Sequence, residues 1–197
     1  MSDQFQHVMV LASIIIGLGI TNALLGVSAA IDSISAEQRT IRFSWASAFW
    51  LASVFLWMLL FWWWEFRLLA ILKTWSMGNY LLVVLYAVLL FLLVALLVPR
   101  NWDEVDDLNQ YFLSKRHWFY SLLLVTNGVD VIDSYVKGGW TYIAAAGVVS
   151  WSQWMAYVPA CIVGFRSNTI RTHTIMAIIF FIWNVVQGFD VFPLLGL

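Results

Sequence analysis

Long runs of apolar residues, separated by short polar links, dominate the pattern along this 197-residue chain. A helix needs about 20 mainly apolar residues to cross the hydrocarbon core of a bilayer. Six runs meet this requirement, and we predict a spanning helix for each: 5–31, 43–64, 78–98, 118–136, 140–165 and 170–192. The links leave no room for a folded domain outside the membrane. The pattern therefore predicts one all-α domain, a polytopic transmembrane helical bundle with six spans.

The link between the third and fourth runs has a helical pattern of its own. Asn101 and Glu104 are spaced as in a capping box, and the link ends on the basic pair Lys115 and Arg116. Apolar residues recur on one face at helical spacing, namely Trp102, Val105, Leu108 and Phe112. We therefore predict a short amphipathic helix over 102–116 that lies on the membrane surface.

Composition also favours a lipid environment. Hydrophobic residues make up 62% of the chain and charged residues 11%, whereas soluble domains average about 45–50% and about 25%. The net charge of −1 offers no basic surface to a nucleic acid. The single Cys161 excludes an intramolecular disulfide and a cysteine-based metal cluster. Membrane lipids are thus the predicted partners, with no nucleic acid, and the sequence identifies no protein partner.

Basic residues are divided unequally between the links. The first, third and fifth links contain Arg39, Arg42, Arg100, Lys115, Arg116, Arg166 and Arg171, whereas the second and fourth contain only Arg67, Lys73 and Lys137. Cytoplasmic loops carry the excess of Lys and Arg in membrane proteins. This asymmetry predicts that the odd-numbered links are cytoplasmic and that both termini lie outside. The N-terminus has no basic region before the first run, so we predict a retained span rather than a cleaved signal peptide.

Carboxylates occur at or near membrane depth in the second half of the fourth run. At about 1.5 Å of rise per residue, Asp130 and Asp133 lie about 21 and 26 Å from Arg116, in the outer half of a core about 30 Å thick. Asn127 falls near the middle. An acid facing lipid costs about 2.5–3.5 kcal/mol on insertion scales, so we expect Asp130 to face the bundle interior.

Other polar residues converge on the same outer leaflet: Glu65, Asn184, Gln187 and Asp190. We expect Asn184, Gln187 or Gln153 to donate to Asp130.

Three classes of function fit these polar residues. The first is a cation or proton site in a small channel or transporter component, with Asp130 at its centre. The second is a polar network that holds helices together in a non-catalytic membrane subunit or adaptor acting through a partner. The third is an intramembrane enzyme, since Asp130 and Asp133 resemble part of the Asp-rich motifs of prenyl and phosphatidyl transferases. Those motifs need a glycine directly after the first Asp or a second Asp-rich stretch, and both are missing here. We therefore predict no catalytic residue.

The three histidines, His7, His117 and His173, are too far apart in sequence to form a local metal motif. We predict no metal and no cofactor. His117 and His173 both begin predicted spans on the cytoplasmic side, so an interfacial haem pair stays open as an alternative, as does a bound quinone.

Small residues recur every four positions in the first run, as Ser13, Gly17 and Thr21 and again as Asn22, Gly26 and Ala30. This spacing lets two helix backbones approach closely. The contact would lie either within the chain or in a homo-oligomer that forms through Gly17, Thr21 and Gly26.

Several local patterns resemble a broad family of small, six-span bacterial integral membrane proteins of uncharacterised activity. The matching pieces are Ser13-Ile-Ile-Ile-Gly-Leu-Gly-Ile-Thr21 with Leu24-Leu-Gly26, Phe61-Trp-Trp63, Leu97-Val-Pro99, Asp107-Leu108, Tyr111-Phe112 and Arg116-His-Trp-Phe119. They cover the first two-thirds of the chain. The resemblance implies six spans in a bacterial cytoplasmic membrane, and it carries over no activity, cofactor or catalytic residue.

Overall fold

The computed structural model describes residues 3–35, 41–71, 76–145 and 147–190. Six α-helices and one 3-10 turn make up almost all of this part: α1 (Asp3–Ser35), α2 (Trp45–Ile71), α3 (Met77–Leu97), η1 (Trp102–Glu104), α4 (Leu108–Ala145), α5 (Gly147–Arg166) and α6 (Ile170–Asp190). The all-α class and the six helices are therefore confirmed.

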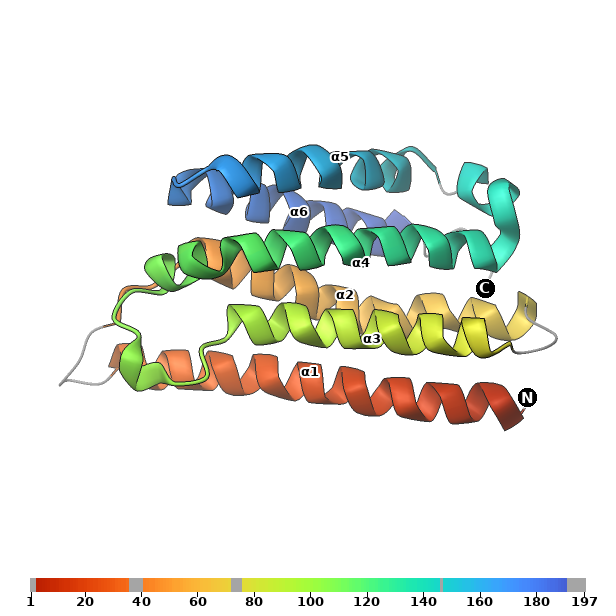
Figure 1. Ribbon diagram of the computed structural model, residues 1–197, viewed down its shortest axis with the longest axis horizontal. Helices are drawn as coiled ribbons and strands as arrows, with labels where there is room; N and C mark the ends of the chain where they lie inside the picture. Colours follow the sequence, from red (N-terminus) through yellow and green to blue (C-terminus); the bar gives the residue numbers. More distant parts are fainter. Residues whose placement is uncertain (1–2, 36–40, 72–75, 146, 191–197) are drawn as a thin grey trace.

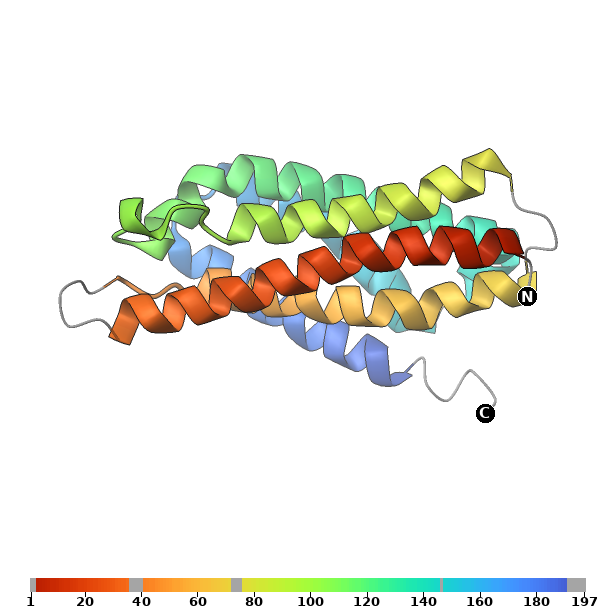
Figure 2. The ribbon, with the colours of Figure 1, turned by 90° about the horizontal axis from the view of Figure 1, so that it is seen from below.

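The helices run side by side along the long axis of the molecule, with successive helices in opposite directions (Figures 1 and 2). In Figure 1, α3 lies between α1 and α4, and α5 covers the far side of α4. α2 packs most extensively on α6 and also on α3 and α4. We call the end where α2 and α4 finish the carboxylate end, after Glu65 and Asp133. The opposite end, which contains Arg42, Arg100 and Lys115, is called the basic end.

Four helical segments are long and apolar enough to cross a membrane: Gln6–Ser33, Trp45–Glu65, Met77–Leu97 and Ile170–Gly188. These segments confirm four of the six predicted spans by length and composition. α4 and α5 are less apolar, because α4 carries Asn127, Asp130 and Asp133 within its fourth-run segment and α5 carries serine and glutamine. The two spans predicted for the fourth and fifth runs therefore stay predictions.

The amphipathic surface helix predicted over 102–116 is wrong. Residues 102–104 form only a 3-10 turn, which is capped where the Asn101 side chain accepts a hydrogen bond from the Asp103 amide at 3.2 Å. α4 then begins at Leu108 and continues into the fourth run without a break. The Asp107 side chain accepts from the Asn109 amide at 2.7 Å and so caps α4 at this position. Of the four apolar residues in the predicted pattern, Leu108 and Phe112 lie in the first turns of α4, Trp102 lies in η1 and Val105 lies between the two elements.

The predicted start of the fifth span at residue 140 falls directly after a break in α4, whereas α5 itself begins at Gly147. α4 stays helical through Lys137 and is interrupted at Gly138 and Gly139, and a short helical segment follows before α5 starts at Gly147. Gly139 has a φ of 62°, in the left-handed region that glycine enters at little steric cost. Gly138 is extended. The glycine pair therefore redirects the chain at the carboxylate end, where Figure 1 shows the turn towards α5.

The small residues of α1 fall on two different faces. A Cβ added at Gly26 would lie 2.6 Å from Val98 Cγ2, so this glycine allows α1 to approach the end of α3. Gly17 has no such neighbour within 4 Å, and Thr21 is exposed. Gly26 thus serves packing within the chain. A homo-oligomer contact through Gly17 and Thr21 stays a prediction.

At the basic end, the first and third links are joined by backbone hydrogen bonds. The Arg42 amide donates to the Asp106 carbonyl at 2.9 Å, and the Leu108 amide donates to the Arg42 carbonyl at 3.0 Å. Beside this bridge, Ile41, Val105 and Leu108 form a small apolar cluster. The pairing fixes where α4 begins relative to α2.

Candidate functional site

The candidate site is a group of charged side chains at the carboxylate end, centred on Lys137 in the last turn of α4 before the glycine break. The Lys137 ammonium donates to Glu65 Oε1 of α2 at 2.8 Å and to Asp133 Oδ2 of α4. The side chains of Lys137, Glu65 and Asp133 are 4%, 1% and 3% exposed. One buried ammonium thus bridges two buried carboxylates from different helices.

Asp130, one turn before Asp133, receives hydrogen bonds from two further helices. The Tyr86 hydroxyl of α3 donates to Asp130 Oδ1 at 2.5 Å, and Trp154 Nε1 of α5 donates to Oδ2 at 2.7 Å. Trp57 Nε1 of α2 donates to the Tyr86 oxygen at 2.7 Å, which leaves the Tyr86 proton for Asp130. Asp130 also interacts electrostatically with Asp133 and Lys137. We refer to Glu65, Asp130, Asp133 and Lys137 as the carboxylate–lysine cluster.

Helical spacing explains why one segment supplies three members of this cluster. Residues three and four positions apart share a helix face, so Asp130, Asp133 and Lys137 point the same way. That face of α4 meets α2 and α3, and aromatic side chains surround it. Tyr86 contacts Trp57 and Phe61 edge to face, with ring centroids 6.2 and 5.4 Å apart. Among these rings, Tyr86 provides a phenol donor to Asp130 and Trp57 provides an indole donor to Tyr86.

The charges of the cluster do not balance when every group is ionised. Three carboxylates face one ammonium, so two negative charges remain unmatched by the cluster itself. Both Asp130 oxygens accept hydrogen bonds, as an ionised carboxylate does. By contrast, Glu65 Oε2 is buried and has no hydrogen-bond partner in the described part of the chain. Unpaired charge is costly in a low-dielectric environment. Glu65 is therefore the carboxylate best placed to carry a proton.

The structure brings some of the predicted site residues together and not others. Glu65, Asp130 and Asp133 meet, as their common depth indicated. Asn127 is buried one turn earlier on α4, and its Oδ1 has no partner among the described residues. Asn184 is buried on α6 and Gln187 is partly buried there. Two donors to Asp130 come from α3 and α5, and the expected donation from Asn184, Gln187 or Gln153 stays a prediction. The side chains of Asp190 and Gln153 lie outside the described part.

Sequence reasoning missed Lys137, Tyr86, Trp57 and Trp154 as parts of this site. Lys137 falls between the predicted spans 118–136 and 140–165 and is therefore counted in an outer link. The four-residue spacing from Asp133 to Lys137 was a usable signal, since an acid four positions before a lysine forms an ion pair on a helix. The three aromatic residues give no comparable signal. They lie among many other aromatic residues of apolar runs, and only tertiary packing selects them.

A second buried polar contact lies nearer the basic end and involves His173 of α6. The Tyr120 hydroxyl donates to His173 Nδ1 at 2.8 Å, and Nε2 donates to the Ser167 carbonyl at 3.2 Å. His117 is exposed and stacks on Phe165, with ring centroids 5.8 Å apart. Both ring nitrogens of His173 are engaged, so ligation of a haem iron would break one of these hydrogen bonds. The arrangement favours a structural role for His173.

Within the described ranges, no three His, Cys, Asp or Glu side chains come together in a geometry that would hold a metal ion. In the carboxylate–lysine cluster, the Lys137 ammonium takes the place between Glu65 and Asp133 that a cation would take. Comparison with known proteins found no matching family, no matching curated protein and no matching solved structure.

Proposed function

We propose that this protein is a small multi-pass protein of the bacterial cytoplasmic membrane that acts as a proton or cation channel or as a transporter component. The carboxylate–lysine cluster is its exchange site. The observation that carries the proposal is the imbalance of three carboxylates, the buried Glu65 and Asp133 and the half-buried Asp130, against one buried ammonium. Ionisable groups within membrane segments generally mark ion pathways and proton relays.

The geometry supports exchange because Lys137 is shared between two acids. Its ammonium contacts Glu65 and Asp133 at once, so protonation of either acid leaves the lysine paired with the other. Glu65 Oε2 is the natural position for the exchanged proton, since this atom is buried without a partner in the described part of the chain. Asp130 accepts hydrogen bonds from two donors that stabilise its ionised form, and its negative charge favours entry of a cation.

The proposal includes six spans. α4 and α5 lie alongside the four apolar helices and run along the same axis (Figure 1). The charged groups of α4 point at α2, α3 and α5, so they do not need to contact lipid. With Lys137 buried, it no longer counts as a basic residue of an outer link. The asymmetry that places the basic end in the cytoplasm and both termini outside therefore becomes stronger.

A second candidate is the non-catalytic subunit or adaptor. It is favoured by the way the cluster ties α2, α3, α4 and α5 together through four hydrogen bonds. In that case the charges specify how the helices pack and carry no flux, and the protein acts through a partner.

Flux measurements in reconstituted liposomes separate the two candidates. Glu65→Gln keeps the shape of the side chain and removes the exchangeable proton, and Asp130→Asn removes the fixed charge. We expect both variants to fold and to lose most of the proton or cation flux, read with an internal pH-sensitive or ion-sensitive dye. Glu104→Gln, an exposed substitution at the basic end, is the matched control. Wild-type protein without flux, or a Glu65→Gln variant with full flux, would overturn the transport proposal.

The orientation is tested with cysteines on exposed positions. Cysteines at Ser35 and Gln110 should be shielded from a membrane-impermeant thiol reagent in intact cells, whereas one at Ser76 should react. The native Cys161 is buried and adds little background. Labelling in the opposite pattern would place the carboxylate–lysine cluster on the cytoplasmic side.

A further inference from the structure

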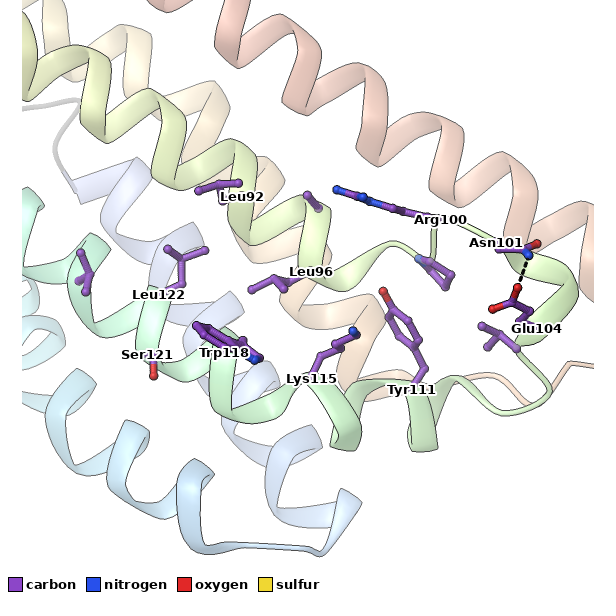
Figure 3. A pocket seen from close by; sticks show the side chains of 14 residues that line it. Leu92, Leu96, Arg100, Asn101, Glu104, Tyr111, Lys115, Trp118, Ser121 and Leu122 are labelled. Carbon is purple, nitrogen blue, oxygen red and sulfur yellow. Dashed lines mark hydrogen bonds between the residues drawn. The ribbon is translucent and has the colours of Figure 1, made fainter.

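A groove of about 870 Å³ lies at the basic end between α3 and α4, on the opposite end of the molecule from the carboxylate–lysine cluster. Apolar side chains form one part of its wall: Leu92, Leu96, Leu122 and Val125. Figure 3 shows Arg100, Asn101, Glu104 and Tyr111 towards one side of the groove and Leu92 and Leu122 towards the other. Lys115 and Trp118 lie between these two parts.

The polar part of the groove, which we call its rim, carries a net positive charge. Arg100 and Lys115 are both exposed, and neither forms an ion pair with any residue that the structure describes. Glu104 is the one acid that lines the groove, and it accepts a hydrogen bond from the Asn101 amide at 2.6 Å. Two cations against one acid leave a single positive charge, which matches one phosphodiester group.

Tyr111 adds a neutral hydroxyl to the rim. Its hydroxyl donates to the Val98 carbonyl at 3.3 Å. Burial raises the pKa of the Tyr111 phenol, and the positive charge of Arg100 partly offsets that rise. The phenol is therefore uncharged at neutral pH and does not repel an anion.

The order of side chains along the groove matches the order of groups in a lipid. Trp118 is 73% exposed, and amphipathic rings of this kind gather at the membrane interface. Beyond Trp118, the exposed side chains of Leu92 and Val125 continue the apolar surface. A soluble anion would contact only the rim. A molecule with an anionic head and a hydrocarbon tail would contact both parts.

We propose that this groove binds one anionic phospholipid. The phosphodiester lies at Arg100 and Lys115, and an acyl chain follows Leu96 and Leu122 between α3 and α4. In the proposed orientation the basic end faces the cytoplasm, where anionic lipids attract basic residues near the surface. The site is independent of the carboxylate–lysine cluster, so it stands even if the protein moves no ion.

Native mass spectrometry of the detergent-purified protein tests the site, with phosphatidylglycerol and phosphatidylcholine added in turn. We expect one phosphatidylglycerol to be retained in preference to phosphatidylcholine. At roughly 1 kcal/mol for each basic residue near an anionic headgroup, the double variant Arg100→Gln/Lys115→Gln should bind phosphatidylglycerol about 30-fold more weakly. Ala95→Phe keeps both charges and fills the groove, and it should also abolish retention. Should the double variant not fold, each single variant should weaken binding about fivefold.

Arg171→Gln is the matched control, because Arg171 is exposed at the basic end and does not line the groove. It should leave binding unchanged. Equal retention of the two lipids, or an equal loss in Arg171→Gln and the double variant, would overturn the proposal. Excess inorganic phosphate distinguishes a lipid site from a simple anion site. Displacement of phosphatidylglycerol by phosphate would show that the rim alone binds and would contradict the proposed lipid.

Discussion

Lys137 and Lys115 are two lysines of one helix with opposite surroundings. Lys137 is 4% exposed and lies between two carboxylates from α2 and α4. Lys115 is exposed on the rim of a groove and has no ion-pair partner in the part of the chain that the structure describes. The comparison shows that the role of a charge in this bundle follows from what the neighbouring helices place around it. At the carboxylate end the lysine is paired within the protein, whereas at the basic end Lys115 remains available to a ligand.

The two ends should differ most in how much replacement of their lysine changes the free energy of unfolding. Lys137→Met leaves the buried carboxylates of Glu65 and Asp133 without their ammonium, which we expect to lower the free energy of unfolding by about 3–5 kcal/mol. Lys115→Met should change it by no more than about 0.5 kcal/mol, as exposed substitutions generally do. Unfolding in mixed detergent micelles measures both values. Similar losses in the two variants would contradict the description of Lys137 as the buried counter-ion.

Removal of a hydrogen bond to Asp130 should give the next largest change in the free energy of unfolding. Tyr86→Phe removes the donor to Asp130 Oδ1 and the acceptor of Trp57 Nε1. Because an unpaired buried polar group costs about 1–3 kcal/mol, we expect a loss of about 2–4 kcal/mol in the same unfolding measurement. Tyr80→Phe, at a partly buried position of the same helix, is the control and should change stability by no more than about 0.5 kcal/mol. Equal effects at positions 80 and 86 would show that the Tyr86 hydroxyl is not essential to the site.

Two faces of α1 can be compared in the same way, although only apolar packing distinguishes them. Gly26→Ala brings a Cβ to 2.6 Å from Val98, and overpacking of this kind costs about 1–3 kcal/mol. Gly17→Ala meets no neighbour within 4 Å, and it should gain up to about 1 kcal/mol from higher helix propensity. Melting temperatures in detergent should therefore move in opposite directions. A loss of stability in Gly17→Ala would instead indicate a contact between copies of the chain on that face.

The smallest effect is expected for an exposed ion pair at the basic end. The Arg42 guanidinium lies 3.6 Å from Asp107 Oδ2, and its side chain is 78% exposed. Arg42→Ala should change the free energy of unfolding by no more than about 0.5 kcal/mol, because solvent screens such pairs. The backbone bridge to Asp106 and Leu108 does not depend on this side chain. A larger loss would show that the ion pair, rather than the backbone, holds the two links together.

Features that depend on local interactions could be predicted from the sequence, whereas features that depend on contacts between distant residues could not. Long apolar runs are local signals, so six helices and four candidate spans could be predicted from them. The convergence of Glu65, Asp130 and Asp133 was also predictable, because helical rise gives the depth of each acid. The start of α4 depends on the Asp107 cap and on pairing with Arg42, which lies far away in the chain. The donors Tyr86 and Trp154 depend on how α3 and α5 pack on α4, and no local pattern gives that information.

The sequence separation between partners in the carboxylate–lysine cluster affects the order in which they are synthesised. Glu65 and Lys137 are separated by 72 residues, so at about 5–20 residues per second the lysine is synthesised roughly 4–14 s after the acid. During this interval, α2 carries a carboxylate whose counter-ion does not yet exist. In the proposed six-span topology, α4 reaches the membrane with a face that matches groups already present on α2 and α3. We infer that the helices inserted earlier then assist the entry of α4, the least apolar long helix, so the final topology depends on the order of synthesis.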